Sequence, residues 1–81
     1  MANETLEEIT EEDFRAGVGE RLRAAILKKY GYRAESLFAE SIGVSQATIS
    51  DICRGNTAPS AFTLFKIDQF SSIDIKKLLR G

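Results

Sequence analysis

The side chains best suited to chemistry lie in one short run, from Ser45 to Asp51. This run offers hydroxyls, an amide and a carboxylate, which hydrogen-bond readily but are weak nucleophiles without an activating base. The chain contains no histidine, so the usual general base and any Cys/His zinc site are missing. No pair of carboxylates sits in an apolar setting that would perturb its pKa. We therefore expect a binding protein with no cofactor and no metal, and not an enzyme.

Apolar and small residues at helical spacing surround this run. They suit two short helices that cross steeply through a tight turn, with the polar run opening the second helix. Gly43 suits the turn because glycine accepts a positive φ, and Ser45 suits the N-cap of the second helix. The residues expected to hold the two helices together are Ala39, Gly43, Val44, Ile49 and Ile52.

A four-residue apolar repeat predicts a helix before this pair. The repeat consists of Phe14, Val18, Leu22, Ile26 and Tyr30. Because two glycines weaken its first turns, the firmest part of the predicted helix is 20–30. Thr10 and Asp13 have the spacing of an N-terminal capping pair, and Gly31 is a stop signal after two lysines.

The remaining sequence predicts four more short helices. We place them at about 34–41, at 46–53, after the N-cap residue Ser60, and at 74–79. The fourth helix carries Phe62, Leu64, Phe65 and Ile67, and the fifth is expected to bury Ile75, Leu78 and Leu79. No segment alternates at the period of a strand. The predicted fold is therefore an all-α bundle of five short helices containing a helix-turn-helix.

Composition and charge suggest a small domain preceded by an acidic arm. The chain has 81 residues, 43% of them hydrophobic, which suits one small globular domain. Its net charge of −1 hides a division, because residues 1–13 carry −6 and residues 14–81 carry +5. We expect 1–12 to be a flexible arm and 13–81 to be the folded domain. A basic body suits phosphate contact.

The sequence also predicts the surroundings of the protein. Its apolar runs are too short for a transmembrane helix, and the acidic N-terminus has no signal-peptide pattern, so we expect a cytoplasmic protein without membrane contact. The single cysteine, Cys53, lies at the end of an apolar helical stripe. We interpret it as a small core residue rather than a redox switch.

The body resembles the lambda repressor/Cro-like helix-turn-helix superfamily, especially the small phage CI-type repressor domains. The resemblance extends from Arg21-Leu22-Arg23 to Leu78-Leu79-Arg80-Gly81 and is most specific between Leu37 and Gly55. It implies a lambda repressor-like fold and an all-helical domain that binds double-stranded DNA. It also implies a bacterial or phage-infected cell as the setting.

The resemblance implies which side chains meet DNA. Within the recognition helix, Gln46 can bond adenine bidentately and Ala47 can meet a thymine methyl. Thr48 can offer its hydroxyl to a base or its methyl to thymine. Ser50 and Asp51 are further candidates for base readout. The candidates for phosphate contact are Arg33, Ser45, Arg54, Asn56, Thr57 and Ser60.

Two positions depart from the superfamily pattern. Many members begin the second helix with a glutamine that contacts phosphate, whereas this chain has Glu35, an anion beside a polyanion. The stretch Phe70-Ser71-Ser72-Ile73 lacks the glycine common before the last helix. These departures concern one phosphate contact and one connection.

The leading functional hypothesis is a sequence-specific transcriptional repressor of phage or prophage type. It would act as a homodimer on a partly palindromic operator, because one recognition helix covers only a few base pairs. Ile73, Ile75, Leu78 and Leu79 are candidates either for a dimer contact or for burial within one chain. The chain is also compatible with the DNA-binding half of a longer repressor.

The main alternative is a protein-interaction module on the same fold, of the antitoxin or antirepressor type. In that case the acidic arm would bind a partner. The arm has two further interpretations, a segment that folds back onto the basic body and competes with DNA, or a solubilising tail.

Overall fold

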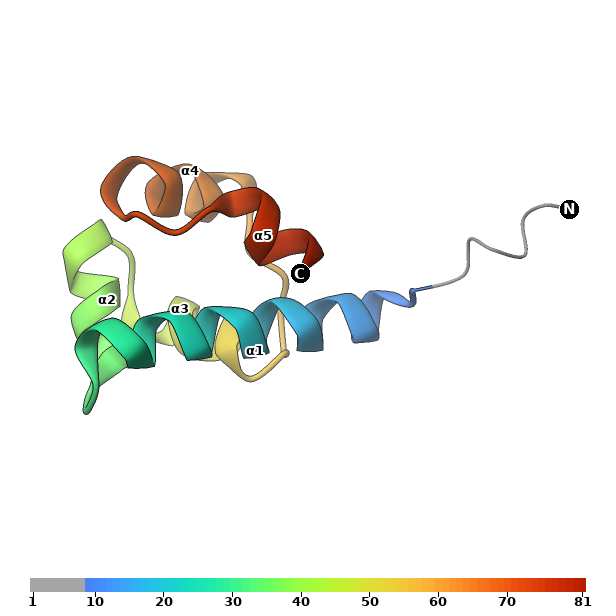
Figure 1. Cartoon of the computed structure of the whole chain (residues 1–81), viewed down its shortest axis with the longest axis horizontal. Coiled ribbons are helices and arrows are strands. Elements are labelled where there is room, and N and C mark those ends of the chain that lie inside the picture. Colours follow the sequence, from blue (N-terminus) through green and yellow to red (C-terminus); the bar gives the residue numbers. More distant parts are fainter. Residues whose placement is uncertain (1–8) are drawn as a thin grey trace, which may run out of the picture.

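Five helices connected by short loops make up the part of the chain that the computed structural model describes, residues 9–81. They are α1 (Glu11–Tyr30), α2 (Ala34–Ile42), α3 (Gln46–Cys53), α4 (Ala61–Phe70) and α5 (Ile75–Arg80). No strand occurs in this range. Figure 1 shows α1 running along one side, with α4 and α5 on the other. The predicted all-α five-helix fold is confirmed.

The N-terminus of α1 is capped as the sequence predicts. The Oγ1 of Thr10 accepts a hydrogen bond of 3.0 Å from the backbone N–H of Asp13. Three acidic residues in the first turn and two lysines in the last complement the helix dipole. The helix begins at Glu11, two residues before the predicted domain boundary. The rest of the predicted arm, residues 1–8, lies outside the described residues.

The core is built from apolar residues of all five helices. Val18, Leu22 and Ile26 of α1 are buried, and Phe14 and Tyr30 pack against them partly exposed. This confirms the four-residue repeat as the inward face of α1. The other helices contribute the buried residues Ala34, Phe38, Ala39, Ile42, Ile49, Ile52, Cys53, Ile67 and Leu78.

The turn between α2 and α3 has the geometry that its residues predict. Gly43 adopts φ 79° and ψ 35°, in the left-handed region where a Cβ is unfavourable. The N–H groups of Gly43 and Val44 both donate to the carbonyl of Ala39, at 2.9 and 3.0 Å. These bonds end α2 and reverse the chain into α3. Val44 then packs partly buried against the core.

At Gly19 the backbone of α1 comes very close to the backbone of α3. A Cβ built at this position would meet the carbonyl oxygen of Ile52 and would lie 2.8 Å from the carbonyl oxygen of Cys53. The backbone of α1 therefore lies directly against the last turn of α3, where carbonyl groups have no partner within the helix. A side chain on α1 at this point would push α3 away. Gly19 thus sets the spacing of these two helices.

The C-terminal helices are attached differently. Among the described helices, α4 contacts α2 and α5, and α5 contacts α1 and α4. Arg21 of α1 secures the end of α5, because its Nε and Nη2 donate to the carbonyls of Leu78 and Leu79 at 2.8 and 3.1 Å. One cationic side chain thereby satisfies two carbonyls of the last turn of α5.

The predicted apolar residues of α4 and α5 are buried unequally. In α5, the predicted burial is confirmed for Leu78. Ile75 and Leu79 were also expected to be buried, but they are only partly buried. In α4, Ile67 is buried and Leu64 is partly buried, but Phe62 and Phe65 are exposed. The outer face of α4 is therefore aromatic, which the helical pattern alone did not indicate.

We expect Gly19→Ala to lower the free energy of unfolding by about 1–3 kcal/mol, because the new methyl group would overlap backbone carbonyls. This is a large fraction of the stability of a domain of this size. Urea unfolding followed by circular dichroism measures the change. Gly17→Ala is the matched control, since its Cβ would meet a side chain and no backbone, with the nearest atom Nη1 of Arg21 at 3.0 Å, the guanidinium nitrogen that does not donate to Leu78 or Leu79. The control should keep or gain up to about 1 kcal/mol from helix propensity. Equal effects of the two substitutions would contradict this account of Gly19.

Candidate nucleic-acid interface

The first turn of α3 presents its side chains to solvent while the opposite face is buried. Ser45 caps the helix, because its Oγ accepts a hydrogen bond of 3.1 Å from the N–H of Thr48. Gln46 and Ala47 are exposed, and Thr48 is partly buried, with its Oγ1 2.8 Å from the Oγ of Ser45. On the inner side, Ile49, Ile52 and Cys53 are buried. The helix is thus fixed by its apolar face and free at its polar start.

Ser50 is engaged by the start of α2. Its Oγ donates a hydrogen bond of 2.5 Å to Oε1 of Glu35, and the pair is partly buried. The carboxylate of Glu35 therefore links the start of α2 to α3 within the domain. The Ser50 hydroxyl, a candidate for base readout, is a donor to Glu35 in this structure. Asp51, the next candidate, is partly buried.

A groove lies beside Gln46 at the junction of α1 and α2. It has a volume of about 500 Å³ and is lined by Arg23, Arg33, Glu35 and Gln46 together with Tyr32 and Leu27. Two guanidinium groups therefore share one groove with the exposed amide at the start of α3. Such a combination offers donors to phosphate close to a side chain that can read a base.

Two residues of this groove were missed from the sequence. Arg23 follows the buried Leu22 and is exposed, and Tyr32 is 89% exposed in the turn after α1. The position of Arg23 next to a stripe residue of α1 shows that it points outward. The sequence pattern does not show that this side of α1 faces the start of α3.

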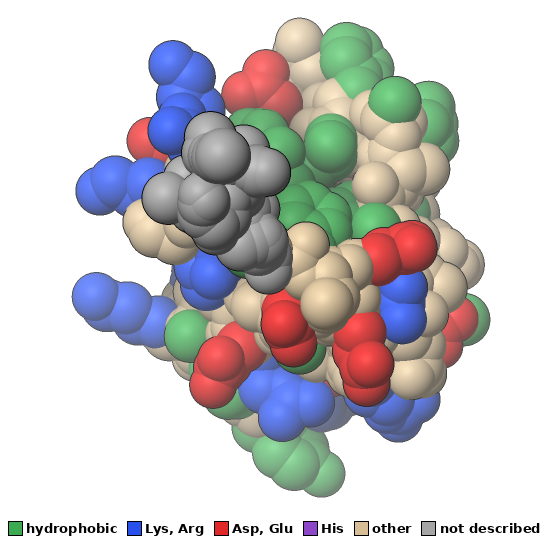
Figure 2. Space-filling model, turned by 90° about the vertical axis from the view of Figure 1, so that its right-hand side faces the viewer, with side chains coloured by type: hydrophobic (Ala, Val, Ile, Leu, Met, Phe, Trp, Pro, Cys, Tyr) green, Lys and Arg blue, Asp and Glu red, His purple; other side chains and the backbone are tan. Residues whose placement is uncertain are grey.

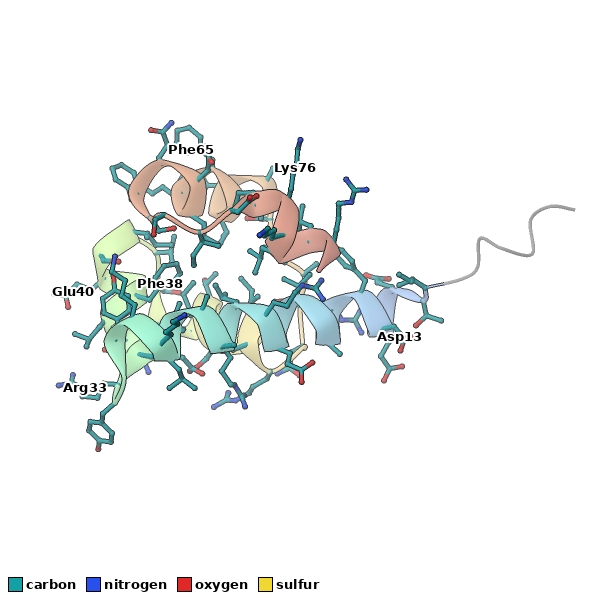
Figure 3. The ribbon with its side chains drawn as sticks, viewed as in Figure 1. Asp13, Arg33, Phe38, Glu40, Phe65 and Lys76 are labelled. Carbon is teal, nitrogen blue, oxygen red and sulfur yellow. The ribbon has the colours of Figure 1, made fainter. Side chains whose placement is uncertain are left out.

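The six phosphate candidates are all exposed. Arg33 adopts a left-handed conformation, φ 66°, and projects from the corner between α1 and α2 (Figure 3). Ser45 and Ser60 act as helix caps, and the Oγ of Ser60 accepts from the N–H of Thr63 at 3.1 Å. The other three lie at the end of α3 or in the loop that follows: Arg54, Asn56 and Thr57.

The loop after α3 is held by one hydrogen bond from α1 and one to α3 itself. The Nε of Arg15 donates to the carbonyl of Gly55 at 3.2 Å, and the N–H of Asn56 donates to the carbonyl of Asp51 at 2.9 Å. These bonds fix the backbone around the exposed Arg54, Asn56 and Thr57. Their side chains can therefore contact a ligand without ordering a long loop.

Cys53 lies behind the interface as a buried thiol. Burial raises the pKa of the Cys53 thiol well above its ordinary value, to about 11, with the carboxylate of Glu35 adding to the increase and Arg23 and Arg54 opposing it. A thiol with such a pKa is a weak nucleophile near neutral pH. This agrees with its interpretation as a core residue. Within residues 9–81, no group of three or more acidic, cysteine or histidine side chains could hold a metal ion.

We expect the stability advantage of the wild type over Cys53→Ala to shrink as pH rises from about 9 to about 11. In this window the unfolded chain loses the thiol proton while the folded chain keeps it, so rising pH favours unfolding. Urea titrations of both proteins at pH 7, 9 and 11 measure the difference, and Cys53→Ala is the control for the titration of other groups. A difference that stays constant or grows would contradict the raised pKa.

None of the helices within residues 9–81 combines the length and apolar character that crossing a bilayer requires.

Comparison with known proteins gives one family. A helix-turn-helix family model of the lambda repressor-like type matches residues 23–78, which include α2, α3, α4 and the connections between them. No curated protein and no solved structure matches the chain significantly. Because the matched segment covers more than half of the chain and carries the capped, half-exposed α3, the protein belongs to this helix-turn-helix family of DNA-binding domains.

Proposed function

We propose that the protein is a sequence-specific transcriptional regulator, of the phage or prophage repressor type, that reads the DNA major groove with α3. One observation carries the proposal most directly. The capped first turn of α3 exposes Gln46 and Ala47, whereas Ile49 and Ile52 fix the same helix to the core. A rigid helix with a free polar start is what major-groove readout requires.

We propose an order of importance for the candidate base-reading residues. Gln46 comes first, because it is exposed and its amide can donate to and accept from adenine in a bidentate pair. Ala47 is exposed beside it and permits a close approach to a thymine methyl. Thr48 shares its hydroxyl with the Ser45 cap, and we place it second. Ser50, held by Glu35, has a positioning role in this proposal.

Phosphate contacts would surround the exposed start of α3. We propose Arg33, Arg54, Asn56 and Thr57 as contacts, with the exposed Arg23 added by the groove beside Gln46. Ser45 and Ser60 have hydroxyls at the N-termini of α3 and α4, where backbone N–H groups also face an approaching anion. These contacts would orient the domain, and the protein would bind a partly palindromic operator as a homodimer.

Gln46→Ala should weaken binding to the preferred DNA by about 5- to 150-fold, the equivalent of about 1–3 kcal/mol, with little effect on random DNA. The preferred site is first selected from a library of random duplexes, and the protein is then titrated with selected and random DNA at several salt concentrations. Arg54→Ala is the contrasting variant. It should weaken both duplexes alike and reduce the salt slope by about one. Equal micromolar binding of the wild type to all duplexes, or no binding, would favour the protein-interaction module instead.

Glu35→Gln should increase DNA affinity at low salt for selected and random duplexes alike, because it removes an anion close to the proposed phosphate path. The glutamine oxygen can still accept from Ser50, so the link between α2 and α3 is retained. Asp68→Asn, on exposed surface of α4, removes the same charge from a helix without contacts to α3. It should change affinity less than Glu35→Gln. A loss of affinity in Glu35→Gln would show that the carboxylate itself supports binding.

A further inference from the structure

A larger groove lies between the C-terminal half of α1 and the connection from α4 to α5, which Figure 1 shows opposite each other. It has a volume of about 530 Å³, within the range of roughly 300–1,000 Å³ that sites for small molecules occupy. Its apolar lining comes from α1, α2, the connection and α5. These residues are Ala25, Ile26, Tyr30, Phe38, Ile73 and Leu78. The groove therefore offers a small molecule an apolar surface.

Four cationic side chains also line this groove. Lys28 and Lys29 come from the last turn of α1, Arg21 from the middle of the same helix, and Lys77 from α5. Figure 2 shows lysine and arginine side chains projecting along its left edge, the side that faces the viewer in Figure 1. Within residues 9–81 the ion pair found joins two residues of the first half of α1, so no carboxylate there is paired with these four cations. An apolar groove edged by such cations complements an apolar molecule that carries a negative charge.

One carboxylate lies among the lining residues. It belongs to Asp74, which caps α5, because its Oδ1 accepts hydrogen bonds from the backbone N–H groups of Lys76 and Lys77 at 2.9 and 3.3 Å. The hydroxyl of Ser71, also in the lining, donates to the carbonyl of Ile67 at 2.6 Å. Four cations thus face one carboxylate that is already hydrogen-bonded. The charge of the groove favours an anion over a cation.

Two of the four cations are better placed than the others to bind an anion. The Nζ of Lys29 lies 5.6 Å from the centroid of the Tyr30 ring, so this ammonium is held over the ring. Arg21 already donates through Nε and Nη2 to carbonyls at the end of α5. Lys28 and Lys77 have exposed side chains and come from opposite walls of the groove. An anion between these two walls can contact both.

This groove is separate from the proposed DNA-reading surface. No residue of α3 lines it. Arg23 and Leu27, which line the groove beside Gln46, are each two residues from Ala25 and therefore about half a turn around α1. The buried Ile26 is the one residue that both grooves share. DNA bound at α3 would leave the larger groove open.

We propose that this groove binds a small organic carboxylate with an apolar body, for which a medium-chain fatty acid is the simplest example. The apolar body would lie against Ala25 and Ile73, which are partly buried and still have surface to cover. The carboxylate would pair with Lys28 and Lys77. Burial of apolar surface and charge-assisted hydrogen bonds would both contribute to binding. Such a site needs no DNA, so it does not depend on the proposed function.

Titration of the full chain with decanoate, followed by the chemical shifts of its backbone amides, tests the site. Saturable shifts are expected at Ala25, Ile73 and Lys77, with a Kd of about 2 mM or tighter for a ligand of this size. Acetate has the charge without the apolar body, and decylammonium has the body with the opposite charge. Both should bind at least about 10-fold more weakly than decanoate, because each lacks one of the two interactions.

A pair of double variants tests the two lysines. Lys28→Gln with Lys77→Gln should weaken decanoate binding about 2- to 30-fold, as expected for the loss of two exposed ion pairs. Lys66→Gln with Lys76→Gln is the matched control, because it removes two cations of α4 and α5 that do not line the groove. It also tests the other place where a cation meets an apolar surface, since the Nζ of Lys66 lies 4.9 Å from the centroid of the Phe70 ring. The control should bind decanoate like the wild type.

A third pair of variants tests the apolar surface. Ala25→Glu would place a long anionic side chain in the groove and should abolish saturable binding. Ala24→Glu is the control, because Ala24 is exposed on the same helix and does not line the groove. Circular dichroism checks that each variant keeps its helices. If Ala25→Glu does not fold, the lysine variants still decide the question.

Three results would overturn this site. The first is the absence of saturable shifts at the groove, and the second is equal binding of decanoate by the two double variants. The third is a set of groove signals that changes on dilution of the protein without decanoate, because a second copy would then occupy the groove. Decanoate binding by a protein that recognises no specific DNA would support the site and remove only the proposed function.

Discussion

Contact between the backbone of α1 and the last turn of α3 sets the geometry on which the rest of the domain depends. At Gly19 the absence of a side chain lets α1 approach the carbonyls of Ile52 and Cys53. This approach buries the stripe of α1 against Ile49 and Ile52, and it fixes the C-terminal end of α3. Because the C-terminal end of α3 is fixed against α1, the orientation of its exposed first turn is fixed as well. Recognition by a short helix needs such a support, because small displacements misplace its hydrogen-bonding groups.

The fold could be predicted from the sequence where local rules and burial agree. Gly43, Ser45 and Ser60 mark a turn and two helix starts through their own backbone chemistry, and the structure places them there. The stripe of α1 is visible because its repeat matches the helical period. Gly19 shows the limit of this approach. Judged by helix propensity alone, Gly19 only weakens α1. In the structure it allows α1 to contact residues more than thirty positions later in the chain.

In the candidate site, the exposed start of α3 was predictable from the sequence, whereas the groove residues Arg23 and Tyr32 and the hydrogen bonds within the site were not. The sequence indicates that Gln46 and Ala47 open a helix, and both are exposed. It does not show that Ser50 would donate to Glu35, because that bond depends on how α2 crosses α3. It likewise treats the phenylalanines of α4 as members of an apolar helix. Their exposure follows from α4 having neighbours on only one side.

The sparse attachment of α4 and α5 also divides the domain into parts of unequal local stability. The helices α1, α2 and α3 pack against one another, whereas α4 touches α2 and α5 alone among the described helices. Proteins open in cooperative segments, and segments with few buried contacts open most readily. The six-residue α5 is held at its end by Arg21. Opening of α4 and α5 would therefore precede loss of the α1–α3 unit, so the apolar surface under these two helices is the first part of the core that water reaches.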